Sequence, residues 1–181
     1  LLGVPADGWA EDQLCDIGTD NSYANGSGTS GDPYQIADYC DLILLSKTSA
    51  DWDKHFVQTA DIAFNADETT VDWDGDGVAD GDTPAGFSPI GNFPTQFNGV
   101  YDGDYHEIQN LYINRPTTNK VGLFGETLTT GVRIEKLVLR DVYVEGKDQV
   151  GALVGYQRAN IDDCGVESGE IKGTSKVGGL I

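Results

Sequence analysis

A glycine-rich apolar phrase returns at nearly constant spacing in the second half of the chain. Val-Gly-Leu-Phe-Gly at residues 121–125 is followed by Val-Gly-Ala-Leu-Val-Gly at residues 150–155 and by Val-Gly-Gly-Leu-Ile at residues 177–181. The first residues of these phrases lie 29 and 27 positions apart. A period of this length is typical of solenoids, in which each repeat buries its apolar face against its neighbours.

A second phrase keeps the same spacing. An isoleucine followed three residues later by an apolar residue or cysteine occurs at Ile108, Ile134 and Ile161, with intervals of 26 and 27 residues. Residues 137–144 alternate in polarity, which predicts strands with one buried face. We therefore predict an all-β protein, a β-solenoid with coils of 26–29 residues. Cys164 falls where a small apolar residue is expected, so we place it in the core.

The first half of the chain has a different pattern. Apolar residues at helical spacing over residues 38–46 predict a short helix with Asp38 as its N-cap. Ser49 is expected to cap a second helical turn over residues 51–54, and residues 55–62 alternate partly, as a strand does. Four apolar side chains should then cover the end of the solenoid: Leu42, Leu45, Trp52 and Phe56.

These patterns divide one continuous structural domain into three parts. Residues 1–62 form an N-terminal segment and cap with short helices, residues 63–86 an acidic insertion, and residues 87–181 the solenoid coils. A cap is expected because an open solenoid end exposes strand edges and apolar core.

Negative charge dominates the chain and is concentrated in its first half. The 30 acidic and 11 basic residues give a net charge of −19, of which −16 lies in residues 1–100. Binding to nucleic acid or an anionic membrane surface is excluded because both need clustered Lys and Arg. No apolar run is long enough to insert into a membrane. The acidic, Gly-rich composition indicates an extracellular or cell-surface protein, and the repulsion calls for a neutralising cation.

An Asp-rich run in the insertion has the spacing of a calcium loop. It reads D-x-D-x-D-G-x-x-D, and the ligands expected from it are Asp72, Asp74, Asp76, the carbonyl of Val78, Asp80 and Asp82. The run resembles the loops of EF-hands, dockerins and thrombospondin calcium repeats. It departs from the EF-hand because Thr83 stands where Glu is expected, so bidentate closure falls to Asp80, Asp82 or a distant acid. The alternative is a solvated acidic turn without metal.

Other chemically interesting residues are few. Trp73 lies between two of the expected ligands, so its ring should either pin the loop to the solenoid or face a ligand such as a sugar. Cys15 and Cys40 lie in one N-terminal segment, and an extracellular location favours a disulfide between them over two separate thiols. With no C-x-x-C pair and only two histidines, a structural zinc site is disfavoured.

Several phrases spread along the chain occur together in one known kind of protein. They are Asp-Pro-Tyr-Gln-Ile at residues 32–36, Asp-Trp-Asp-Lys-His-Phe at 51–56, Ser-Pro-Ile-Gly at 88–91, Phe-Asn-Gly-Val-Tyr-Asp-Gly at 97–103 and the Val-Gly phrases. In this combination, residues 26–181 resemble bacterial cell-surface proteins with GLUG-motif repeats. The resemblance implies a right-handed β-solenoid of adhesin-like character without an established catalytic centre. Residues 67–82 are an insertion relative to that pattern, and the repeat is interrupted at Ile181.

The expected function is therefore structural or adhesive and non-enzymatic. Calcium should stabilise the acidic loop, and the interrupted repeat suggests self-association end to end, into a fibre or surface layer. One alternative is a calcium-dependent module that binds surface polysaccharide. A second is a polysaccharide-degrading enzyme using carboxylates, calcium and a base, but the acidic half offers only Lys47 and Lys54 as bases. No catalytic residue is predicted.

Overall fold

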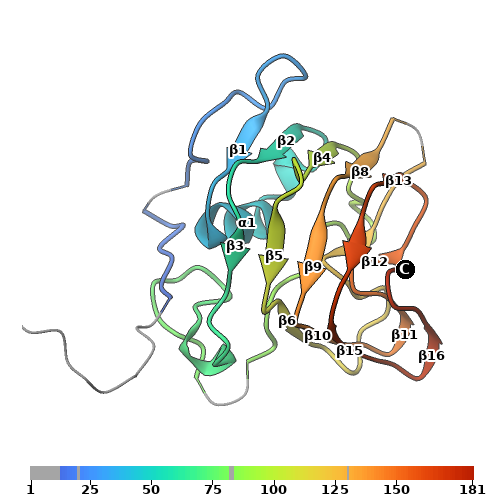
Figure 1. The fold of residues 1–181 in the computed structure, drawn as a ribbon. Coiled ribbons are helices and arrows are strands. Elements are labelled where there is room, and N and C mark those ends of the chain that lie inside the picture. Colours follow the sequence, from blue (N-terminus) through green and yellow to red (C-terminus); the bar gives the residue numbers. More distant parts are fainter. Residues whose placement is uncertain (1–12, 20, 82–83, 130) are drawn as a thin grey trace, which may run out of the picture.

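The computed structural model describes residues 13–19, 21–81, 84–129 and 131–181 (Figure 1). Short strands dominate this part of the chain. The helical elements are α1 (Tyr39–Lys47) and the 3-10 helices η1 (Ser49–Asp51) and η2 (Glu68–Thr70). The protein is thus mostly β, as the sequence predicts.

The strands form five sheets, and every neighbouring pair within a sheet is parallel. The largest sheet has the order β1 (Tyr34–Ile36), β2 (His55–Gln58), β4 (Val100–Asp102), β8 (Arg133–Glu135) and β13 (Asn160–Asp162). The second has the order β3 (Ile62–Ala63), β5 (Glu107–Gln109), β9 (Val138–Arg140) and β14 (Gly165–Val166). The others are β6 (Tyr112–Asn114), β10 (Val142–Glu145) and β15 (Gly169–Lys172), then β7 (Phe124–Glu126) with β12 (Val154–Tyr156), and β11 (Asp148–Val150) with β16 (Ser175–Val177).

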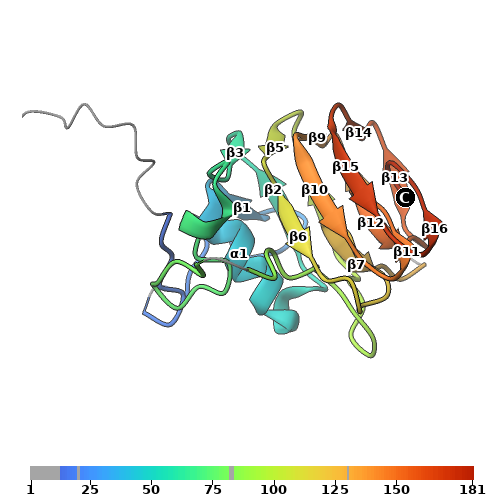
Figure 2. The ribbon, with the colours of Figure 1, turned by 90° about the horizontal axis from the view of Figure 1, so that it is seen from below.

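The chain passes through these sheets in the same order in three successive circuits, and we call each circuit a pass. Among the described residues, the first pass has no strand in the β11–β16 sheet, and the third has none in the β7–β12 sheet. The first pass runs through β4, β5, β6 and β7, the second through β8 to β12, and the third through β13 to β16. Each strand therefore pairs with its counterpart one pass away, so that the passes lie side by side (Figure 2).

The register confirms one repeated phrase and corrects the other. Val121 pairs with Val150, and Val150 with Val177, which matches both intervals of the Val-Gly phrase. Ile134 pairs with Ile161, as expected, but its partner in the first pass is Tyr101. The predicted equivalence of Ile108 with Ile134 is wrong, because Ile108 belongs to the next strand and pairs with Leu139.

In five of the strands, the core residue is the central one of three. In β4, β5, β6, β8 and β9 this residue is buried while its two neighbours are more accessible, which is the alternation of a strand with one inward face. Ile62, Ile108 and Leu139 stack in register as one apolar ladder, and all three are at most 1 % exposed. The corresponding residues of the third pass, such as Ile161 and Ile171, are only half-buried.

At the corners between strands, the left-handed backbone conformation recurs from pass to pass. Left-handed residues recur at equivalent positions: Lys120, Gln149 and Lys176 in one series, Asn110 and Asp141 in a second, and Lys136 and Asp163 in a third. The glycines of the Val-Gly phrase are required for a different reason. A Cβ on Gly125 would lie 2.4 Å from the carbonyl oxygen of Gly91, and one on Gly155 would lie 2.4 Å from the backbone of Lys120. Glycine is needed there because the backbones of adjacent segments meet.

The N-terminal part contributes strands as well as the expected cap. β1 and β2 extend the largest sheet, and β3 extends the second. The expected strand over residues 55–62 is in fact two strands, β2 and β3, separated by a corner. The side chains of Leu42, Leu45, Trp52 and Phe56 are all buried in the common core, as expected of a cap.

Helix α1 begins where the sequence predicts. The side chain of Asp38 accepts hydrogen bonds from the amides of Cys40 and Asp41, which satisfies two amides that the helix cannot pair internally. The second turn differs from its prediction: Ser49 lies inside η1 and its N-cap is Thr48, which makes no side-chain capping bond.

Replacement of the cap gives a first testable prediction. Asp38→Ala should lower the free energy of unfolding by about 1 kcal/mol, because two amides of the first turn lose their acceptor. Asp38→Asn keeps an acceptor oxygen, so its free energy of unfolding should fall by only a few tenths of that amount. Urea denaturation of the three proteins measures the difference, and equal losses in both variants would show that capping is not the cause.

Candidate metal centre

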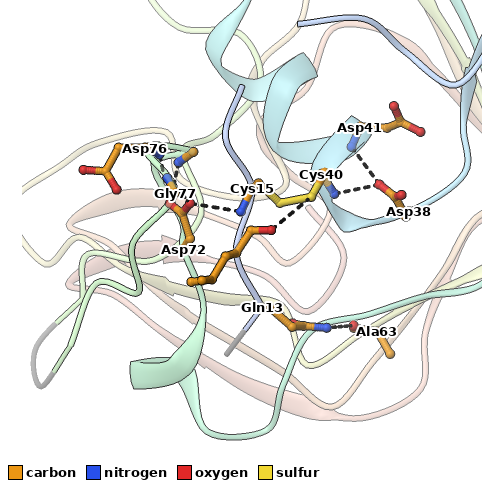
Figure 3. Close-up of a disulfide and its surroundings, with 11 residues drawn as sticks. Gln13, Cys15, Asp38, Cys40, Asp41, Ala63, Asp72, Asp76 and Gly77 are labelled. Atoms are coloured by element: carbon orange, nitrogen blue, oxygen red, sulfur yellow. Dashed lines mark hydrogen bonds between the residues drawn. A yellow bond between two sulfur atoms is a disulfide. The ribbon is translucent and has the colours of Figure 1, made fainter. Parts of the chain in front are cut away.

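The acidic loop is built around the carboxylate of Asp72, which is fully buried. One oxygen accepts hydrogen bonds from the amides of Gly75 at 2.6 Å and Asp76 at 3.2 Å. The other accepts from the amides of Gly77 at 2.7 Å and Cys15 at 3.1 Å (Figure 3). Four backbone donors on one carboxylate bend the chain into a tight loop and hold it against the N-terminal segment.

Three acidic side chains converge beside this turn. Carboxylate oxygens of Asp72, Asp74 and Asp80 all lie within 4.8 Å of one another. Asp80 also accepts the amide of Trp73 at 2.7 Å, which ties the end of the loop to its beginning. The pKa of Asp74 is raised, first by burial and then by repulsion from Asp76 and Asp80. None of the ion pairs in the described residues involves the three converging carboxylates.

The remaining predicted ligands do not join this group. Asp76 accepts the amide of Val78 at 2.9 Å, and its side chain points away from Asp72 in Figure 3. Asp76 is therefore not part of the converging group, and its place among the calcium ligands stays a prediction. Val78 has a side chain that is 65 % exposed. Asp82 lies outside the described residues.

Trp73 packs into the protein and does not offer its ring to a ligand. Its side chain is 2 % exposed and lies 4.6 Å from the ring of Phe64, centroid to centroid. The indole nitrogen donates to the carbonyl oxygen of Glu68 at 2.9 Å. A ligand-facing role for this ring is therefore wrong, whereas its role in pinning the loop fits the geometry.

A disulfide joins the N-terminal segment to helix α1. Cys15 and Cys40 are bonded to each other, and Cys164 is a free, half-buried cysteine packed against the core. The same N-terminal segment runs alongside the acidic loop: the amide of Ile17 donates to the carbonyl oxygen of Gly75 at 3.0 Å. Gly75 has a φ of 78° and lies under the Ile17 side chain, so a Cβ there would clash at 2.7 Å. The disulfide thus anchors the N-terminal segment at residues 15–17, which holds the acidic loop in place. We call this segment the strap.

Sequence reasoning missed the structural role of Asp72. The pattern predicted Asp72 as a metal ligand, but the structure makes it a buried acceptor of four amides, with the exposed carboxylates of Asp74 and Asp80 beside it. The signal available was the apolar residue Val71 immediately before it, which is buried and begins the loop next to Gln13.

Comparison with known proteins finds two similar sequences. A stretch of 157 residues, 86 % of the chain, is 36 % identical to Halomucin from Haloquadratum walsbyi. A stretch of 150 residues, 81 % of the chain, is 32 % identical to a protein provisionally named a Gly-rich membrane protein from Evansella cellulosilytica. The chain spans only 2 % and 16 % of the lengths of these relatives.

Neither family models nor solved structures match this chain. The similarity to GLUG-motif proteins therefore rests on the phrases in the sequence itself. Among the described residues, no helix has both the length and the apolar character required to cross a membrane.

Proposed function

We propose that this chain is a structural module of a cell-surface protein, built as a right-handed β-solenoid, stabilised by calcium and without catalytic activity. The observation that carries the proposal is the pairing of strands in step: five sheets, all parallel, each linking a strand to its counterpart in the next pass. The recurrence of left-handed corner residues at equivalent positions supports the same architecture. Such stacking makes a stiff rod with loops along its sides.

A location at the cell surface is supported by three observations. The relatives carry the names Halomucin and Gly-rich membrane protein, and each is many times longer than this chain. The disulfide between Cys15 and Cys40 fits an oxidising compartment. The net charge of −19 suits a soluble, hydrated surface.

The geometry of the acidic loop fits calcium in part. Calcium takes six to eight oxygen ligands, and Asp74 and Asp80 can supply two exposed carboxylates that converge beside the buried Asp72. Backbone carbonyls and water would complete the shell. A divalent cation would relieve the repulsion that raises the pKa of Asp74. Its contribution would be structural, holding a loop that carries uncompensated negative charge.

We further propose that the solenoid extends end to end through a second copy. In the described chain, the third pass forms the outer strand of each of the four sheets that it joins, with β13, β14, β15 and β16. Val177, in β16, is 44 % exposed. Unpaired backbone edges next to apolar side chains favour strand addition.

Light scattering and thermal melting, each with millimolar calcium and with chelator, test both parts of the proposal. Calcium should raise the melting temperature. The free energy of unfolding should rise by about 2.7 kcal/mol when free calcium exceeds the dissociation constant a hundredfold. Asp74→Asn should abolish this shift. Asp163→Asn is the matched control, because it removes an exposed acid outside the loop and Asn tolerates the left-handed backbone there.

Each outcome has a distinct reading. Large particles at high protein concentration support end-to-end association, and their loss on chelation would place calcium in control of it. A monomer under all conditions would exclude self-association and leave the calcium proposal to the melting data. Identical melting curves with calcium and with chelator would exclude calcium.

A further inference from the structure

A pocket of about 400 Å³ lies between two loops, and no described residue of the acidic loop lines it. One loop precedes β4 and projects from the body of strands (Figure 2), and the other joins β6 to β7. The residues that the argument uses are Ser88, Asn92 and Phe93 from the first loop and Arg115, Thr118 and Asn119 from the second.

Arg115 brings a positive charge into this pocket without an acidic partner. Its Nη2 donates to the carbonyl oxygen of Gly86 at 3.1 Å and to the hydroxyl of Ser88 at 3.4 Å, and its Nε donates to the carbonyl oxygen of Phe87 at 3.3 Å. These neutral acceptors fix the guanidinium plane and leave Nη1 for another acceptor. No ion pair in the described chain involves this half-buried side chain, although the sequence has 30 acids.

The pocket therefore carries one uncompensated positive charge. Lys120, which also lines it, forms an ion pair at 2.7 Å with the buried carboxylate of Glu126. The free Nη1 can donate a charge-assisted hydrogen bond to a single carboxylate, and the positive charge of the guanidinium offsets the carboxylate's negative charge. Phosphate-rich ligands and nucleic acids fit poorly, because they need several cations and would be repelled by a net charge of −19.

Phe93 supplies an apolar surface at the rim. Its side chain is 78 % exposed, the highest value among the large hydrophobic residues of the described chain. Tyr112 and Tyr143 are less accessible, because their rings stack on each other at 5.1 Å and the ammonium of Lys172 lies over Tyr143 at 4.8 Å. Tyr105 is 68 % exposed but does not line this pocket. An exposed ring beside hydroxyl and amide side chains has the composition of a site that holds a molecule with both C–H faces and hydroxyl groups.

We propose that this pocket binds a carboxylate-bearing sugar, such as a uronate unit of an acidic polysaccharide. The carboxylate pairs with Arg115, the sugar ring packs on Phe93, and the sugar hydroxyls meet Ser88, Asn92, Thr118 and Asn119. This assignment goes beyond the structural role proposed above and does not depend on calcium or self-association. It also replaces Trp73 as the aromatic residue through which this module would contact a polysaccharide.

Isothermal titration of the 181-residue chain with trigalacturonate tests the proposal, with a neutral galactose trisaccharide and an acidic tripeptide as comparison ligands. Saturable binding of trigalacturonate is expected, with weaker binding of the other two. Phe93→Ala should weaken it about tenfold through loss of ring contact. Arg115→Lys should also weaken it about tenfold, because an ammonium cannot reproduce the three hydrogen bonds that hold the guanidinium in place, and should leave binding of the neutral trisaccharide unchanged.

Two control variants match these changes elsewhere on the surface. Tyr105→Ala removes another exposed aromatic side chain, and Arg158→Gln removes another guanidinium that has no acidic partner among the described residues. Both should bind trigalacturonate as the parent does. Thermal melting checks that each variant is folded. Absence of saturation at millimolar ligand, equal binding of the neutral sugar or tripeptide, or unchanged affinity in Phe93→Ala would each overturn the assignment.

Discussion

Asp72→Ala is expected to lower the free energy of unfolding by roughly 3–4 kcal/mol even in the presence of chelator. The buried carboxylate accepts four amides, and removing it leaves those donors without a partner in a place that water reaches poorly. Three of the amides belong to the loop itself and the fourth belongs to Cys15. The variant should therefore loosen both the loop and the N-terminal segment.

Asp74→Asn is the matched comparison for this experiment. Asp74 belongs to the same acidic group, but its side chain is largely exposed. Its pKa is raised first by partial desolvation and then by repulsion from neighbouring acids. In chelator, removal of its charge should leave stability unchanged or slightly increase it, because repulsion is relieved. With calcium, the same variant should lose the stabilisation that the ion provides. Urea denaturation under both conditions separates the two roles, and a loss below about 1 kcal/mol for Asp72→Ala in chelator would refute the structural role of Asp72.

The parts of the fold that were predictable depend either on residues close together in sequence or on residue types that repeat from pass to pass. The start of α1 could be predicted because Asp38 caps its own first turn. The Val-Gly phrase could be predicted because the residues that pair, Val121, Val150 and Val177, also have the same type. Ile108 was misaligned because the first-pass counterpart of Ile134 is Tyr101, whereas the next strand has an inward isoleucine at a similar spacing. Spacing alone does not tell one strand from the next.

Other features depend on contacts between distant segments. Lys120, Gln149 and Lys176 adopt the left-handed conformation at one corner although neither residue type favours it, so the packing of passes imposes it. The burial of Trp73 requires Phe64 beside it. The pocket around Arg115 exists only where the loop after β6 meets the loop before β4. No local pattern indicates such meetings, so the candidate sugar site was not predictable from the sequence.

The disulfide gives the second large expected effect. Replacing both Cys15 and Cys40 with serine should lower the free energy of unfolding by about 3.5 kcal/mol, the chain-entropy estimate for a closed loop of this size. The two cysteines are 25 residues apart, and the closed loop contains the turn-rich segment before β1. Cys164→Ser is the control, because this half-buried cysteine is free and should have a much smaller effect.

The same substitution should also weaken calcium binding if the acidic loop is a calcium site. The amide of Cys15 donates to Asp72, and the segment that follows packs over Gly75, so the disulfide fixes one side of the loop. When that strap is released, part of the binding free energy must be spent on ordering the loop. Calcium titration of the double-serine variant should therefore show a higher dissociation constant than titration of Cys164→Ser. Equal dissociation constants would mean that the loop is ordered by Asp72 alone and that the strap serves only global stability.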